Sequence, residues 1–221
     1  AGGTGGDFTT LGYGLLTTGV YNVDVPNDDA FVGVYSPQGV LYWGWLINDD
    51  AFQNDEMEAV AFGPNDIVAV VGHVQGPVII PSVSGSNPID PYQSGSDVFV
   101  AMFSSTGVLL WAHSFGAIDQ FNSQDDYGWA VAFDPDGNVY VGGETPGKLP
   151  FSDKENPNQK LDCFILKYNI SGDFQWGIQI GTEQDESVYG LDYRFDEDSG
   201  EGVVVMTGYS LGNMYGPNQG D

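Results

Sequence analysis

The stretch of sequence that decides the fold is SDVFVAMFSSTGVLLW, residues 96–111, because its skeleton occurs three times in the chain. The same skeleton stands in DAFVGVYSPQGVLYW, residues 29–43, and in DCFILKYNISGDFQW, residues 162–176. In every copy an Asp is followed by aromatic residues at the second and sixth positions after it, by Gly at the tenth and by Trp at the fourteenth. Matches at five positions in three copies indicate an internal repeat.

The residues that follow each Trp also correspond. After an acidic stretch come EAVAFGPNDIVAVVGHV, WAVAFDPDGNVYVGGET and LDYRFDEDSGEGVVVMTGYS, at residues 58–74, 129–145 and 191–210. Apolar and small residues alternate in short runs bounded by Gly, Pro, Asn and Asp, which predicts antiparallel strands and hairpins. Four strands in each period, without helical periodicity, predict an all-β chain of the β-propeller class with four-stranded antiparallel blades. A parallel β-helix is the weaker interpretation, because its rungs are shorter.

Composition limits the classes of function. The 221 residues are 41% apolar and 14% aromatic, which is enough for a hydrophobic core. Against 31 acidic residues stand 5 basic ones, so the formal net charge is −26. Such a surface repels nucleic acid, and no apolar run is long enough to insert into a membrane. The acidity fits either solubility in a secreted or salt-adapted protein or the attraction of divalent cations.

Two neighbouring segments resemble a known family. DVFVAMFSSTGVLLW, followed by an acidic linker and by AVAFDPDGNVYVGGET, is similar to the SBBP β-propeller repeat. The second copy matches best; the first has NDI in place of the Gly-Asn turn, and the third lengthens that turn to EDSGEG. The resemblance covers nearly the whole chain. It implies a propeller with the AVAF strand innermost, in a secreted or surface protein, and it implies no common activity.

The repeat divides the chain within one propeller segment, residues 1–221. Sequence repeats are expected at about 29–96, 97–161 and 162–221, with 1–28 ending a preceding repeat. Structural blades are expected at about 58–115 and 129–180, with partial blades in 1–47 and 188–221, or about three blade-equivalents. A propeller closes with about four to eight blades. We therefore expect either a segment of a longer chain or copies whose partial blades complete one another.

Acidic residues concentrate in the loops that lead into the predicted innermost strands, and strand direction places these loops on one face. This acidic rim is a candidate calcium site, since Ca²⁺ takes six to eight oxygen ligands in flexible geometry. No EF-hand pattern is present, and DPDGN at 134–138 is predicted to be a hairpin turn. No other cofactor is indicated. The candidate ligands are Asp49, Asp50, Asp55, Glu56, Asp119, Asp125, Asp126, Glu183, Asp185 and Glu186.

Repeated residues outside the rim are predicted to be structural. The Asp that begins each copy, at positions 29, 97 and 162, is expected to anchor loops by accepting backbone N–H groups. The three repeated Trp residues, at 43, 111 and 176, are expected to pack between blades. Trp129 borders an acidic loop at the channel mouth and is a candidate contact for sugar or peptide. Cys163 is expected to be a small buried residue, and Asn169 begins a glycosylation sequon usable in a secreted eukaryotic protein.

No catalytic constellation is evident in the sequence. His73 and His113 fall in predicted strands, and His73 corresponds to Glu144 of the next copy. A nucleophile elbow, a zinc-binding His pair and a Cys cluster are all lacking. We therefore expect a non-catalytic interaction or structural module at the cell surface or outside the cell. Its expected partners are other protein chains or missing blades, in a homo-oligomer or filament if copies associate. Two alternatives stay open: the propeller domain of a secreted hydrolase or oxidoreductase with catalytic residues elsewhere, and a structural subunit of an extracellular polymer.

Overall fold

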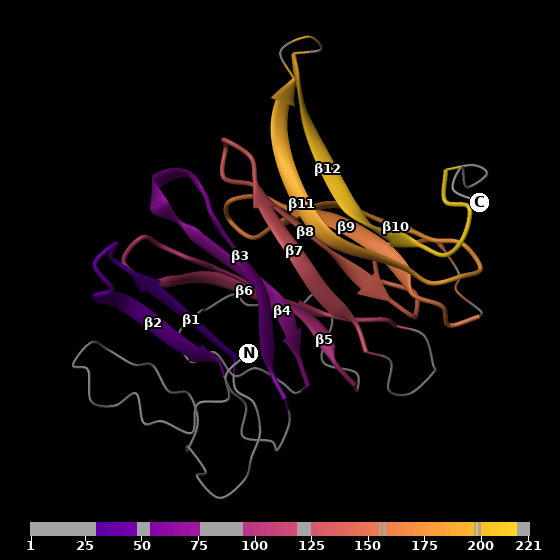
Figure 1. Ribbon diagram of the computed structural model, residues 1–221, viewed down its shortest axis with the longest axis horizontal. Coiled ribbons are helices and arrows are strands. Elements are labelled where there is room, and N and C mark those ends of the chain that lie inside the picture. The colour runs from indigo at the N-terminus through magenta and orange to yellow at the C-terminus, as the bar shows by residue number, and fades with distance from the viewer. Residues whose placement is uncertain are drawn as a thin grey trace, which may run out of the picture.

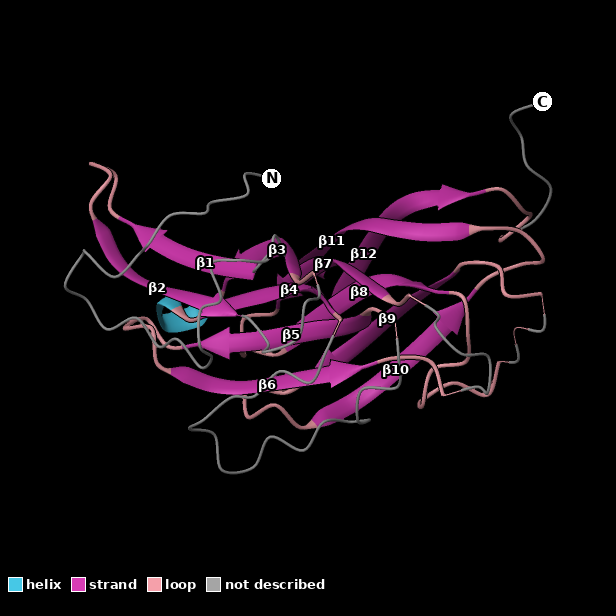
Figure 2. Cartoon of the chain, turned by 90° about the horizontal axis from the view of Figure 1, so that it is seen from below, coloured by secondary structure: helices cyan, strands magenta, loops and turns pink. Residues whose placement is uncertain are grey.

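The chain folds into two four-stranded antiparallel sheets flanked by two hairpins (Figure 1). The computed structural model describes residues 30–47, 54–75, 95–118, 125–154, 156, 158–196, 198 and 200–215. None of these residues belongs to a helix that is long and apolar enough to cross a membrane. The one helix among the described residues is a three-residue 3₁₀ turn, η2 (Pro64–Asp66), seen in cyan near β2 in Figure 2.

In both sheets the strands follow one another in chain order, as the blades of a propeller do. The first hairpin consists of β1 (Ala30–Tyr35) and β2 (Leu41–Ile47). The first sheet consists of β3 (Glu56–Phe62), β4 (Val68–Val74), β5 (Asp97–Phe103) and β6 (Leu109–Phe115). The second sheet consists of β7 (Tyr127–Phe133), β8 (Val139–Thr145), β9 (Asp162–Tyr168) and β10 (Phe174–Ile180). The last hairpin consists of β11 (Glu186–Asp196) and β12 (Glu201–Ser210).

These sheets confirm the predicted fold class. The two whole blades were expected at 58–115 and 129–180, and the observed sheets start two residues earlier and end at the same positions. The two hairpins correspond to the partial blades. The first strand of each unit is the predicted innermost one, and β3, β7 and β11 lie beside one another (Figure 1). We call these three strands the inner edge.

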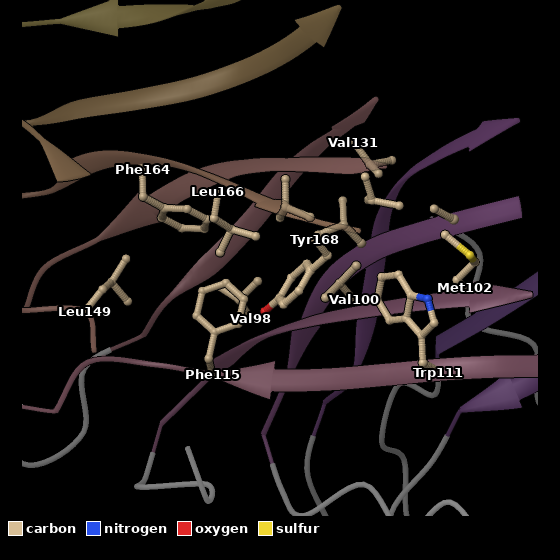
Figure 3. Packing of buried hydrophobic residues seen from close by; sticks show 14 of the residues in the cluster. Val98, Val100, Met102, Trp111, Phe115, Val131, Leu149, Phe164, Leu166 and Tyr168 are labelled. Carbon is tan, nitrogen blue, oxygen red and sulfur yellow. The ribbon is translucent and has the colours of Figure 1, made fainter. Parts of the chain in front are cut away.

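Hydrophobic side chains pack between neighbouring blades (Figure 3). Phe115 of the first sheet meets Phe164 of the second with 5.7 Å between ring centroids, and Trp111 meets Tyr168 at 5.5 Å. β4 and β8 are buried along their whole length, because each is covered by a neighbouring unit on both faces. Each large apolar side chain buried in this way contributes about 1.5–3 kcal/mol. Packing between blades therefore holds the arc of sheets together.

The repeated Trp residues fasten one blade to the next. The indole N–H of Trp43 donates to the carbonyl of Ser105 at 3.1 Å, and that of Trp111 donates to the carbonyl of Ile170 at 3.1 Å. Each acceptor lies in the turn between the third and fourth strands of the following blade. The predicted inter-blade packing is thus confirmed for Trp43 and Trp111. Trp176 is 40% exposed, since the described part of the chain holds no third-to-fourth-strand turn beyond it.

Tight turns of the same type join the third and fourth strands of three units, at the end opposite the acidic rim. Gly39, Gly107 and Gly172 adopt φ angles of 82°, 81° and 85°, which favour glycine. The Gly107 turn must also be glycine for space, because a β-carbon there would lie 2.7 Å from the ring of Trp43. The Asp134–Asn138 segment is a hairpin turn as predicted, closed by a 3.1 Å bond from the Asp134 N–H to the Asn138 carbonyl.

Candidate binding site on the inner edge

The acidic rim lies where the first and third strands of each unit begin. Of the ten candidate calcium ligands, Asp49, Asp50 and Asp119 lie outside the described residues. The other seven are described, and they differ in environment. Three are buried and four are exposed or partly exposed. The buried ones are Asp55, Asp126 and Glu186; the others are Glu56, Asp125, Glu183 and Asp185.

Adjacent carboxylates clamp the second blade to the first. The Ser96 N–H, just before β5, donates to Oδ1 of Asp125 at 2.9 Å, and its carbonyl accepts the Asp126 N–H at 2.6 Å. The Asp126 carboxylate then accepts the N–H of Ala117 at 2.9 Å. Both acidic residues directly precede β7. They therefore fix how the chain leaves one blade and enters the next.

The same clamp recurs one blade later. The Leu161 N–H donates to Oδ1 of Asp185 at 3.1 Å, and its carbonyl accepts the Glu186 N–H at 2.7 Å. The buried Glu186 carboxylate accepts the Thr182 N–H at 2.7 Å and the Ser210 hydroxyl at 2.9 Å. Repetition at two consecutive junctions shows that the paired acids are part of the blade-to-blade connection.

These clamps give the rim carboxylates a structural role that the sequence did not suggest. Asp55 behaves similarly, since its Oδ1 accepts the Gln75 N–H at 3.1 Å. The backbone N–H groups and hydroxyls bonded to these carboxylates give them a structural use that requires no metal. Among the residues that the structure describes, no three His, Cys, Asp or Glu side chains are arranged to hold a metal ion. A calcium site would need further oxygens beyond these.

The repeat Asp residues also anchor loops, but by a different contact from the one expected. Asp29 lies outside the described residues. The buried Asp162 carboxylate accepts bonds from Lys154 Nζ at 2.7 Å and from Gln179 Nε2 at 2.8 Å. Its hydrogen-bond partners are side chains rather than backbone N–H groups, because the β8–β9 loop folds Lys154 back over it. The expectation of backbone donors is therefore wrong for Asp162.

A β-bulge interrupts the pairing of each first strand at the same place. The register shifts between Met57 and Ala59 in β3, between Gly128 and Ala130 in β7, and between Val188 and Gly190 in β11. The extra residues are Glu58, Trp129 and Tyr189. Bulges re-aim a side chain and are frequent beside binding sites. The inner edge therefore presents one such residue from each of three adjacent units.

Aromatic and polar side chains surround the central bulge. Trp129 stacks on Tyr127 at 5.4 Å between centroids, and His73 of the preceding blade meets Tyr127 edge-on at 4.7 Å. Neither the Trp129 indole N–H nor the hydroxyl of Ser187 has a hydrogen-bond partner of ordinary geometry among the described residues. Both lie near the carboxyl of Glu144, which faces β11.

Two carboxyl groups near the inner edge have raised pKa values. Burial raises the pKa of Glu144; the Ser187 hydroxyl and Trp129 indole N–H oppose this, and Asp185 adds to it. Burial, together with the charge and hydrogen bonding of neighbouring Glu56, raises the pKa of Glu58. Burial is the largest cause of both shifts, and neighbouring carboxylates add to each.

Positive charge is scarce on these strands. The only basic residue in β3, β7 and β11 is Arg194, whose Nη2 lies 3.8 Å from Asp196 at the far end of β11. Three carboxylates at the rim end, those of Glu56, Glu58 and Asp125, are exposed to solvent, and Tyr189 is 62% exposed. The arrangement suits a cation flanked by aromatic rings.

The cysteine and the two histidines of the described residues are not arranged as a nucleophile with its base. Burial raises the pKa of the Cys163 thiol to about 12, as expected for a small buried residue. His113 is used in packing, with Nε2 2.7 Å from the Gly172 carbonyl. Burial lowers the pKa of His73, although Glu56 and Asp125 oppose the shift. Asn169 lies in a turn opposite the rim and bonds Asp173, so its glycosylation stays a prediction.

Two curated proteins resemble this chain over long stretches. Regulatory protein FlaEY of Caulobacter vibrioides is 29% identical over 142 residues, which are 61% of this chain and 14% of that protein. The uncharacterized WD repeat-containing protein L264 of Acanthamoeba polyphaga mimivirus is 22% identical over 181 residues, which are 68% of this chain and 13% of that protein. The chain therefore spans only a small share of the length of either relative.

A family model places the repeat directly. Residues 111–150 match the model described as a beta-propeller repeat, SBBP. This segment contains most of β6 and all of β7 and β8, so the sequence unit joins the last strand of one blade to the first two strands of the next. It includes the Asp125–Asp126 clamp and the Trp129 bulge. The four-stranded antiparallel sheets agree with this match, which identifies residues 111–150 as a β-propeller repeat of the SBBP family.

Proposed function

We propose that this propeller segment is a non-catalytic interaction module of an extracellular or cell-surface protein, and that partner proteins contact it at the acidic rim. One observation carries the proposal: the rim is fixed by repeated clamps, while side chains beside those clamps stay exposed. Asp185 and Glu186 hold the junction, and Glu183 in the same loop is exposed. A rigid surface with free polar groups binds partners at a low cost in conformational entropy.

The relatives support a modular role. Each is several times longer than the part this chain matches, and their names, a regulatory protein and a WD repeat-containing protein, mention no reaction. A propeller repeated inside long proteins serves well as a scaffold for contacts. The secreted-enzyme alternative would place its catalytic groups in other parts of such a protein.

One feature favours a second candidate, a structural subunit of a polymer. Within the described residues β12 pairs only with β11, whereas its equivalents β4 and β8 each pair on both sides. Val203 and Val205 of β12 are 38% and 50% exposed. An open strand edge with apolar side chains invites another strand. That strand can come from the same chain or from a second copy.

Site-specific photo-crosslinking in the full-length protein tests the rim proposal. A photoreactive phenylalanine at Glu183 probes the rim, and one at Ser171, exposed at the opposite end of the same blade, is the matched control. We expect crosslinks to another protein from position 183 and far fewer from position 171. Equal yields at the two positions, or none at 183, would contradict a partner-binding rim.

A further inference from the structure

We propose that the bulged inner edge binds the protonated side chain of a lysine or arginine from the partner. This inference rests on the proposed function, and it assigns the contact to Glu58, Trp129 and Tyr189. A bulge at the same place in three consecutive units sets these residues side by side on neighbouring strands. The repetition argues that their placement is a property of the fold rather than a local irregularity.

Negative charge gathers on the first of these strands. Glu56 and Glu58 are two residues apart, and both are exposed. Burial is the largest cause of the raised pKa of Glu58, and the charge and hydrogen bonding of the neighbouring Glu56 carboxyl add to it. No basic residue of β3 or β7 offsets them. An incoming ammonium or guanidinium group would relieve this repulsion, and an anionic or neutral group would not.

Buried polar groups provide a second, independent indication. Ser187 is 1% exposed, and its hydroxyl approaches the Glu144 carboxyl without a hydrogen bond of ordinary length and angle. The Trp129 indole N–H approaches the same carboxyl in the same imperfect way. Buried polar atoms are almost always well hydrogen-bonded, so these long contacts indicate that Glu144 can accept a further donor. A bound donor could be accepted by the carboxyl of Glu144 and the oxygen of Ser187.

Aromatic rings complete the surroundings. Trp129 stacks on Tyr127 at 5.4 Å, and Tyr189 lies 5.7 Å from Tyr209 of β12. The faces of Trp and Tyr rings attract cations, and Arg more often than Lys. Carboxylates beside such rings distinguish a cationic side chain from an apolar one. The inner edge thus combines both kinds of group that recognise an organic cation.

Binding of fluorescent pentalysine amide to the full-length protein, followed by anisotropy, tests the proposal. Salt at about 0.15 M limits long-range attraction to the acidic chain. We expect E58Q to weaken binding about fivefold and W129L about tenfold, as loss of a carboxylate and of a cation–π contact should do. D136N is the matched control, because it removes one exposed charge in a turn at the opposite end. It should change the dissociation constant less than about twofold.

The pH dependence of pentalysine binding distinguishes binding at this site from general attraction by the net negative charge. Binding of pentalysine should strengthen as the pH rises above the ordinary glutamate pKa, because Glu58 loses its proton there, and E58Q should flatten this rise. Equal weakening by E58Q and D136N would overturn the proposal, since binding would then follow total charge. So would unchanged binding in a W129L variant shown by circular dichroism to be folded. Crosslinking at position 183 without pentalysine binding would leave the interaction module standing and refute only the cation site.

Discussion

Gly116, between β6 and the loop into the next blade, is a position with little room for a side chain. A β-carbon there would collide with the Asp97 carboxylate and come within 2.9 Å of Asp126 Oδ2. Both carboxylates are buried, at 2% and 1% exposure. We expect G116A to lower the free energy of unfolding by about 1–3 kcal/mol, the usual cost of overpacking. Urea denaturation measures this loss.

A double-mutant cycle with D97A checks the cause. If the methyl group collides with the Asp97 side chain, G116A should cost clearly less in the D97A background than alone. Additive losses would show that the damage comes from the backbone instead.

Single residues also show what the sequence conceals. The acidic pairs at the start of β7 and β11 are plain in the sequence, but their partners Ser96 and Leu161 are more than twenty residues away. Only the blade geometry brings donor and acceptor together, so the sequence alone predicts metal ligands where the structure has hydrogen-bond acceptors. The signal that was available is the recurrence of two adjacent acids before a first strand. Carboxylates in such a fixed position have a structural use as readily as a chemical one.

At the scale of strands, the sequence predicted the pairing pattern well. Alternation and turn residues placed both whole blades with an error of two residues at one end. The bulges are not evident from the sequence, although Glu58 and Trp129 align there as the first residues of EAVAF and WAVAF. Only the strand partners Gly72, Gly143 and Gly208 show that Glu58, Trp129 and Tyr189 are the extra residues of three equivalent bulges.

The hydrogen bond from Trp111, in the fourth strand of one blade, to the next blade should make a measurable contribution to stability. W111F removes the indole donor to the Ile170 carbonyl and should lower the free energy of unfolding by about 1–2 kcal/mol. W176F is the matched control, since Trp176 is 40% exposed, and it should cost less than about 0.5 kcal/mol. Guanidinium denaturation of both variants gives the comparison. Equal losses would show that the Trp111 bond adds nothing to the cohesion between blades.

For the whole molecule, the net charge of −26 raises the question of calcium. The buried rim acids Asp55, Asp126 and Glu186 already accept backbone N–H groups, so the blades should hold together without the ion. We expect the unfolding midpoint and the native mass to be the same in calcium and in chelator at matched ionic strength. Calorimetry and light scattering measure the two quantities, and magnesium controls for simple charge screening. If the rim bound calcium, a calcium concentration one hundred times the dissociation constant would add about 2.7 kcal/mol to the free energy of unfolding. That gain would raise the unfolding midpoint by several degrees. Such a rise in calcium alone would show that the rim binds the ion, with Asp49, Asp50 and Asp119 as the first ligands to replace.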